Sequence, residues 1–327
     1  MALMDHTGAS DDFDMWKKLG LDKIVWVFMD YLTDTGQSAG SQVGAKAAGP
    51  RTMWGVPLKE IAAGKAKYQE FGTPPMLGYT STAEIDKYPY WPDPDKFDYN
   101  ASVARAKKAS EDFAVIGPWV SFFEIYCQLR GIEQAMLDLL MYPDLVQVTL
   151  DRVEYVQTQM MKRFLDMASP YIDLVFVSDD IGGQDNLLIS PDSWHTFLKP
   201  RMERWCSLIH FYGLKVFYHT DGAAEGLVEP LIGTGIDVLN PIQHACPGME
   251  TKRLKKKYGS RIIFHGGIDN QTVLPFGTTE EVRKETLNCL ENLGAGREGY
   301  ICSSCHNVQA GTPIENILAM IETVHNW

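Results

Sequence analysis

The chain has 327 residues, of which 45% are hydrophobic and 22% charged, and its formal net charge is −12. This length suits a single α/β barrel with added segments. The acidic balance excludes a nucleic-acid surface, which would need clustered Lys and Arg. The one basic run, Lys252–Lys257, is interpreted as the solvated face of a short helix. No apolar run approaches the roughly 20 residues of a membrane span.

The N-terminal sequence and the cysteine spacing predict a cytoplasmic protein. The first residues, Met1–His6, lack the basic region and apolar core of a secretory signal. The six cysteines have no disulfide-scaffold spacing, so we expect reduced thiols. Cys302 and Cys305 form a C-x-x-C pair without a second pair, which argues against a structural zinc knuckle.

Residues 1–100 are predicted to form a loop-rich N-terminal segment that packs on a larger barrel. Residues 21–30 contain a strand or a helix. The stretch Thr35–Gly49 is rich in Gly, Ser and Ala and predicts a mobile loop. Residues 51–100 carry many prolines, which exclude a long helix and favour a hairpin with loops.

From residue 101 to residue 327, helices and strands are predicted to alternate. Helices are expected at Ala101–Phe113, Gly131–Met141, Pro143–Ala168, Asp192–Tyr212, Ala224–Gly233, Met249–Tyr258, Thr279–Leu293 and Pro313–His325. Strands are expected at Ala114–Pro118, Ile172–Val177, Leu214–Tyr218, Gly235–Asn240, Arg261–His265 and Gly299–Cys302. This order predicts an α/β fold, a closed (β/α)8 TIM barrel forming one domain. A doubly wound open sheet is the rival, but no Gly-rich phosphate loop is present.

Polar, ligand-capable side chains follow strand after strand of this pattern. In a barrel they would converge on one mouth and form an active site. They are Glu124, Asp179, Asp180, His219, Asp221, Asn240, Gln243, His265, Asp269, Cys305 and His306.

Two chemistries fit these residues. In a zinc site, His219, Cys305 and a carboxylate from Asp221, Glu124 or Asp180 would leave one position open for substrate. In metal-free acid–base catalysis, Asp180 and His219 would transfer protons. A cysteine at the polar mouth favours the metal site.

The ordered motifs Asp179-Asp180-Ile181-Gly182, His219-Thr220-Asp221-Gly222, Phe264–Asp269 and Thr312–Ile317 resemble the uroporphyrinogen decarboxylase superfamily. The resemblance runs from about residue 100 to the C-terminus and implies a TIM barrel. True decarboxylases of this family carry an Arg-rich N-terminal segment that binds substrate carboxylates. Here Arg51 is the only Arg among the first hundred residues, which argues against decarboxylation.

The resemblance to the zinc methyltransferases of this superfamily implies methyl transfer to or from a corrinoid protein. His219 matches the His of their His-x-Cys motif, Asp221 stands at the first Cys, and Cys305 matches the distant Cys. A carboxylate in place of a thiolate makes the site harder and suits an ether oxygen better than a thiol. The chain is therefore similar to first methyltransferases of anaerobic O-demethylase systems.

This resemblance implies Zn²⁺ on His219, Asp221 and Cys305, with Glu124 as an alternative third ligand. Asp180 would orient substrate or protonate the leaving phenolate, and Asp179 and Asp269 would assist catalysis. The partners would be a corrinoid (cobalamin) protein and a small methylated donor, and the homodimer of the decarboxylases stays open. Alternatives are a methylcorrinoid:thiol methyltransferase, a decarboxylase-like lyase and a non-catalytic corrinoid- or ligand-binding barrel. The expected substrate-binding residues are Glu124, Trp119, Phe123, Tyr126, Asn240, Gln243 and His265, although the aromatic ones could equally serve packing.

Overall fold

The computed structural model describes residues 2–32, 34, 38–41, 51–63, 66–309 and 311–327. The chain divides into two compact units. Unit 1 contains Met1–Ile24, Ile181–Leu187 and Phe217–Trp327, and unit 2 contains Val25–Asp180 and Leu188–Val216. Strand β8 (Lys215–His219) begins in unit 2 and ends in unit 1.

One sheet has seven strands in the order β1-β6-β7-β8-β9-β10-β11. Within unit 2, β6 pairs in parallel with β7, and Lys215 at the start of β8 donates its N–H to Asp173 before β7. Within unit 1, β8, β9, β10 and β11 pair in parallel, neighbour to neighbour. The remaining bounds are β1 (Ile24–Trp26), β6 (Ala114–Val120), β7 (Leu174–Ser178), β9 (Val238–Asn240), β10 (Ile263–Ile268) and β11 (Tyr300–Ser304).

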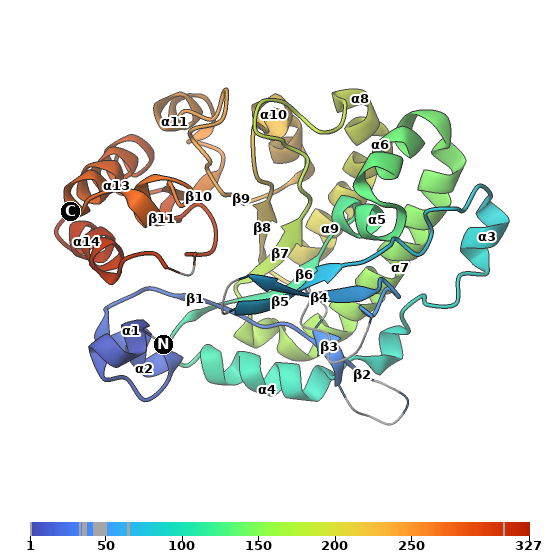
Figure 1. The fold of residues 1–327 in the computed structure, drawn as a ribbon, viewed down its shortest axis with the longest axis horizontal. Helices are drawn as coiled ribbons and strands as arrows, with labels where there is room; N and C mark the ends of the chain where they lie inside the picture. Colours follow the sequence, from blue (N-terminus) through green and yellow to red (C-terminus); the bar gives the residue numbers. More distant parts are fainter. Residues whose placement is uncertain (1, 33, 35–37, 42–50, 64–65, 310) are drawn as a thin grey trace. The chain divides into compact units, whose positions relative to one another are not determined.

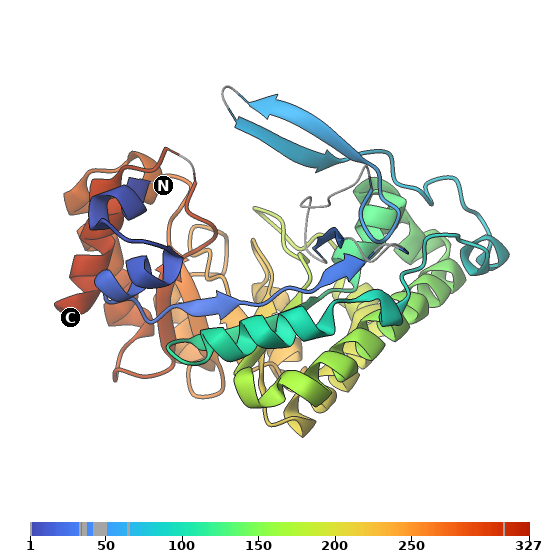
Figure 2. The same ribbon diagram turned by 90° about the horizontal axis from the view of Figure 1, so that it is seen from below.

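Unit 2 carries the longest helix, α7 (Pro143–Ala168), and two antiparallel hairpins outside the sheet. Pro143 begins α7 at a position that needs no N–H donor, and the helix buries an apolar stripe from Leu145 to Ala168. Figure 2 shows the β4–β5 hairpin standing apart from α4 and α7 of its own unit. The other elements are β2 (Asp30–Leu32), β3 (Ser38–Ser41), β4 (Leu58–Ala63), β5 (Ala66–Phe71), α3 (Thr82–Asp86), η1 (Pro94–Lys96), α4 (Tyr99–Ala109), α5 (Phe123–Arg130), α6 (Ile132–Met141), η2 (Ser169–Tyr171), α8 (Pro191–Ser193), η3 (Trp194–Leu198) and α9 (Lys199–Phe211).

The candidate functional residues of unit 1 lie at or near the ends of strands β8 to β11. Thr278 and Glu281 form a capping box that begins α13, which packs against α14 through Val282 and Ala319; the two helices appear together in Figure 1. The helices of this unit are α1 (Ala2–Thr7), α2 (Asp12–Lys18), α10 (Glu225–Thr234), α11 (Thr251–Tyr258), α12 (Val273–Phe276), α13 (Thr279–Leu293) and α14 (Ile314–His325).

The predicted parallel α/β architecture is confirmed, but the closed eight-stranded barrel is not. The described residues form a seven-stranded sheet whose order ends at β1 and β11. The chain before β1 forms two short helices. Among the described residues, β2 pairs with β3 and β4 pairs with β5 in separate two-stranded sheets, and Tyr31 of β2 forms an isolated bridge with Phe97. Because these N-terminal strands pair with each other, they add no further strand to the main sheet.

Two local predictions were also altered. Within the predicted loop Thr35–Gly49, Ser38–Ser41 is strand β3. The rest of that stretch, residues 35–37 and 42–49, lies outside the described residues. The predicted helix Asp192–Tyr212 is interrupted by the π-turn η3, which directly precedes α9, a helix whose second residue is Pro200. Proline has no N–H to continue an α-helical ladder, so the preceding turn widens.

No helix in the described part of the chain combines the length and apolar character needed to cross a membrane. No disulfide joins the six cysteines, all of which are described.

Candidate metal and substrate site

The site is built on the end of β8 in unit 1. Val216–His219 is buried, and Gly222 follows with a φ of +81°. A Cβ on Gly222 would lie 2.3 Å from the carbonyl oxygen of Gly183, and one on Gly182 would lie 2.4 Å from that of Asp221. Glycine is therefore required for the two segments to approach so closely. This packing holds Asp221 at the edge of a cavity.

A series of side-chain hydrogen bonds orients His219. Its Nδ1 lies 2.7 Å from Oδ1 of Asn240, whose Nδ2 lies 2.7 Å from Nδ1 of His265. The amide oxygen can only accept, so Nδ1 of His219 carries the proton and Nε2 keeps its lone pair. The amide nitrogen can only donate, so Nδ1 of His265 accepts. Burial lowers the pKa of His265 to about 3, which keeps that ring neutral.

Three side chains that could ligate a metal lie close together beside this series of hydrogen bonds. The ligand atoms of His219, Asp221 and His306 all lie within 4.8 Å of one another, and the rings of His219 and His306 have centroids 5.8 Å apart. His219 is buried, Asp221 half-buried and His306 exposed. Two imidazoles and a carboxylate are a donor set that Zn²⁺ accepts in catalytic sites.

Cys305 lies next to this cluster without belonging to it. Its side chain is 6% exposed, and its Sγ donates to the carbonyl oxygen of Ile242 at 3.2 Å. Burial raises the pKa of the Cys305 thiol to about 12. In this arrangement Cys305 is a neutral thiol that lines the cavity.

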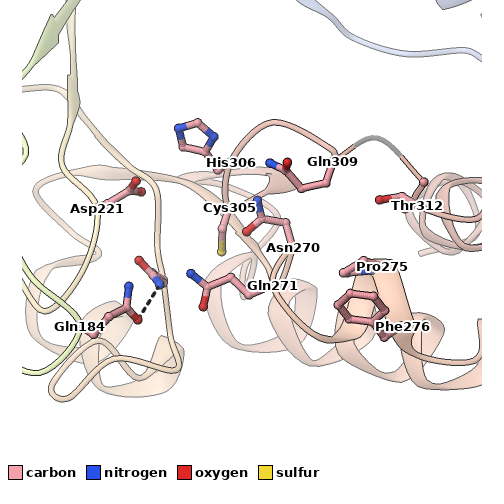
Figure 3. A pocket seen from close by; sticks show the side chains of 12 residues that line it. Gln184, Asp221, Asn270, Gln271, Pro275, Phe276, Cys305, His306, Gln309 and Thr312 are labelled. Carbon is pink, nitrogen blue, oxygen red and sulfur yellow. Dashed lines mark hydrogen bonds between the residues drawn. The ribbon is translucent and has the colours of Figure 1, made fainter. Parts of the chain in front are cut away.

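The cavity has a volume of about 630 Å³ and a lining of mixed polar and apolar groups. Figure 3 shows Pro275 and Phe276 at the end of the cavity opposite Asp221. Phe276 is 83% exposed and offers an aromatic face. Among the described residues, the lining contains neither Lys nor Arg; it comprises Gln184, Asp221, Gln243, Asn270, Gln271, Pro275, Phe276, Cys305, His306, Gln309, Gly311 and Thr312.

Gln243 positions the turn that carries Asp221. Its Oε1 accepts the N–H of Gly222 at 2.9 Å, and its Nε2 donates to Oε1 of Gln184 at 3.4 Å. Both amides border the cavity. Gln243 is thus held by two partners and supports the end of β8.

Asp269, one of the predicted catalytic carboxylates, caps the turn after β10. Its side chain accepts the N–H of Gln271 at 2.7 Å, the N–H of Thr272 at 3.2 Å and the hydroxyl of Thr272. Burial acts to raise the pKa of Asp269, but these hydrogen bonds outweigh it and lower the pKa. Its carboxylate therefore stabilises the entry to α12, beside the cavity residues Gln271 and Pro275.

The predicted carboxylates of unit 2 lie at the ends of β6 and β7. Oδ1 of the buried Asp179 accepts from the Ser121 hydroxyl at 2.9 Å and from the N–H of Phe122 at 3.0 Å, and also from the N–H groups of Phe123 and Glu124. Burial raises the pKa of Asp179 to about 7, against these hydrogen bonds. Glu124 accepts from the Ser178 hydroxyl, and Asp180 is half-buried at the end of unit 2.

The predicted aromatic substrate residues are packed inside unit 2. Trp119, Phe123 and Tyr126 are at most 6% exposed. The Tyr126 hydroxyl donates to Oδ2 of Asp138 at 2.7 Å, and Arg130 forms a buried ion pair with the same carboxylate.

Unit 1 thus brings together His219, Asp221, Asn240, His265, Gln243 and Cys305. The expected ligand set omitted His306, although it follows β11 beside Cys305, and that position after a strand was its sequence signal. The amide and apolar lining, including Gln271 and Phe276, had no such signal because it comes from the turn after β10 and the start of α12.

The chain resembles known proteins in both sequence and fold. A family model described as uroporphyrinogen decarboxylase (URO-D) matches residues 64–327. Uroporphyrinogen decarboxylases of Thermus thermophilus and Coxiella burnetii are 29% and 22% identical over 169 residues, covering 51% and 48% of this chain. These matches cover 46% and 45% of the relatives, so the chain spans about half the length of the curated relatives it matches. A solved methyltransferase from Methanosarcina mazei shares the fold, with a TM-score of 0.66 and 17% identity, covering 99% of this chain and 90% of that one.

Proposed function

The chain belongs to the uroporphyrinogen decarboxylase family, and from this premise we propose that it is a zinc-dependent methyltransferase. The methyl group would pass from a methoxylated aromatic compound to the Co(I) corrinoid of a partner protein. One observation carries the proposal: His219, Asp221 and His306 cluster within 4.8 Å, and Asp221 and His306 line a cavity without basic side chains among the described residues.

The lining of the cavity argues against decarboxylation of a porphyrinogen. Such a substrate carries many carboxylates, which proteins bind through Arg and Lys. The described lining supplies amides, a thiol, a carboxylate and an aromatic ring instead. It suits a small neutral molecule with an apolar ring and a polar group.

The donor set of the cluster fits a metal. Asn240 accepts a hydrogen bond from Nδ1 of His219, which leaves Nε2 as the nitrogen that would ligate a metal, the arrangement that hydrogen-bond partners give to ligating imidazoles. We assign the third donor to His306 and retain Cys305, on the same cavity, as the competing third ligand. Bound Zn²⁺ would supply Lewis acidity at the ether oxygen of the donor.

The chain's own residues would bind and orient the substrate. Pro275 and Phe276 would contact the aromatic ring at the end of the cavity opposite Asp221, which places a methoxy substituent toward the cluster. In the transfer, the methyl carbon leaves the ether oxygen with neither bonding electron and takes both electrons of its new bond from Co(I). The ether oxygen keeps the bonding pair and leaves as a phenolate, which takes a proton from solvent; protonation by Asp180, which belongs to unit 2, stays a prediction from the sequence.

A methyl-transfer assay tests this proposal. Purified protein is incubated with Co(I) cobalamin and a panel of methoxyarenes, methylamines, methyl thiols and halomethanes, and methylcobalamin is followed by its absorption. We expect turnover with a methoxyarene and its loss in Asp221→Ala. No methyl transfer from any member of the panel would refute the proposal. CO2 release from uroporphyrinogen, which we do not expect, would establish the lyase instead.

The methylcorrinoid:thiol reaction is the second candidate, because Cys305 lies on the cavity as the family's distant Cys would. It is tested by incubating methylcobalamin with 2-mercaptoethanesulfonate and the protein. Thioether formation that depends on Cys305, without methoxyarene turnover, would favour it over ether cleavage. A non-catalytic binding barrel would give neither reaction.

A further inference from the structure

A second group of side chains that could ligate a metal lies in unit 1 and shares no residue with the cavity lining. It consists of His244, Glu285 and Cys289, whose ligand atoms all lie within 4.8 Å of one another. His244 follows β9, whereas Glu285 and Cys289 lie on α13. A four-residue spacing places the latter two on one face of the helix.

Hydrogen bonds hold these three side chains in place. Nε2 of His244 lies 2.5 Å from Oε1 of Glu285, so these atoms share a proton. Cys289 is fully buried, and its Sγ donates to the carbonyl oxygen of Gly267 at 3.4 Å. Replacing these protons by one cation needs a modest separation of the imidazole and carboxylate.

The donor types select the kind of cation. One imidazole nitrogen, one carboxylate oxygen and one thiolate sulfur are ligands of Zn²⁺, whereas Mg²⁺ and Ca²⁺ require oxygen donors. The side chains of His244 and Glu285 are 24% and 13% exposed, so water can complete the coordination.

We propose that His244, Glu285 and Cys289 form a second, structural Zn²⁺ site. On binding, the Cys289 thiol would lose its proton, and the proton between His244 and Glu285 would also be released to solvent. The ion would tie the segment after β9 to α13. That segment includes Gln243, which accepts a backbone N–H of the turn that carries Asp221. The second site would therefore stabilise part of the cavity lining at the first site. This inference does not depend on the proposed methyl transfer.

Cobalt(II) substitution tests the proposal, because thiolate ligation gives a near-ultraviolet charge-transfer band. The background variant His219→Ala/Cys305→Ser removes a His and the nearby thiol of the first site. We expect this variant to bind about one equivalent of Co²⁺ with the thiolate band. Adding Cys289→Ser should abolish the band, whereas adding Cys246→Ser, another buried cysteine outside the cluster, should leave it unchanged.

A second measurement guards against loss of folding. Glu285→Gln in the same background preserves side-chain shape and should weaken Co²⁺ binding at least about tenfold, a loss that even outer-sphere partners of a metal can cause. Circular dichroism confirms that each variant is folded. Absence of the band in the background variant, its persistence after Cys289→Ser, or unchanged affinity in Glu285→Gln would each overturn the second site.

Discussion

At the scale of single residues, the orientation of His219 depends on Asn240. The amide accepts from His219 and donates to His265, and each distance is 2.7 Å. Because His265 is neutral, it can accept that hydrogen bond without a competing charge. These contacts support a positioning role for Asn240 behind the proposed metal ligand, and the direct substrate contact predicted for it stays a prediction.

We expect Asn240→Leu to weaken zinc binding at the first site by about 10–100-fold, as loss of an outer hydrogen bond to a ligating His does. The physical reason is that His219 loses the acceptor for its Nδ1 proton and can rotate or change tautomer. Competition with a coloured zinc chelator measures the affinity. The exposed Asn326→Ala serves as the control. Equal affinities in the two variants would contradict this positioning role.

The third ligand is decided by comparing His306→Ala with Cys305→Ser. If His306 is the ligand, as proposed, its loss should reduce zinc at the first site, whereas Cys305→Ser should retain it. The structure supports this order because His306 belongs to the 4.8 Å cluster and the Cys305 thiol donates to Ile242. Elemental analysis is carried out in a Cys289→Ser background, which removes the contribution of the second site. The reverse order would assign the site to Cys305.

At the scale of elements, Asp179 joins the end of β7 to the start of α5 in unit 2. Its carboxylate accepts N–H groups that the first turn of a helix leaves without intrahelical partners. Sequence alone could not separate this role from catalysis, because a carboxylate after a strand fits both. The observed contacts support helix capping.

Asp179→Asn should remove a pH dependence of stability. Burial raises the pKa of Asp179 to about 7 in the folded protein, above about 3.9 for unfolded Asp. Between these values the folded protein keeps a proton that the unfolded chain has lost, so wild-type stability falls as pH rises from about 4 to about 7. Urea unfolding across this range should show the variant gaining stability relative to wild type. Asp144→Asn, at an exposed position, controls for the loss of one carboxylate.

The ion pair between Arg130 and Asp138 connects α5 with α6. Their side chains are 1% and 0% exposed, and Tyr126 also donates to the carboxylate. Asp138→Ala leaves a buried guanidinium without its partner, so we expect unfolding to become easier by about 3–5 kcal/mol. Denaturant unfolding of Asp138→Ala beside the exposed Glu133→Gln measures this. A difference below about 1 kcal/mol, the size of a surface ion pair, would contradict the assignment.

At the scale of the whole molecule, both proposed metal sites should contribute to thermal stability. A ligand that binds only the folded state raises the unfolding temperature by mass action. Chelator treatment should therefore lower Tm, and added Zn²⁺ should restore it. The variant His219→Ala/Glu285→Gln should respond weakly to both treatments in differential scanning calorimetry. An identical Tm with and without chelator in the wild-type chain would argue against both sites.

Much of the fold could be predicted from local patterns. The helix at Pro143–Ala168 has the predicted bounds because a proline begins it and one apolar stripe runs along it. The N-terminal part was harder to predict, since the short strands β2 to β5 carry little periodic signal and pair in two-stranded sheets that are separate from the main sheet. The same limitation led to the prediction of a closed barrel.

The sequence by itself determined that polar side chains follow strand after strand, and the parallel direction of these strands predicted that His219, Asn240 and His265 lie at the same end of the sheet. Only the tertiary structure decided which of them touch. His306 approaches His219 and Asp221, Cys305 turns to Ile242, and Asp179 caps α5. The physical reason is that strand order follows from hydrophobic and turn patterns along the chain, whereas side-chain partners depend on distances of a few ångströms between segments far apart in sequence.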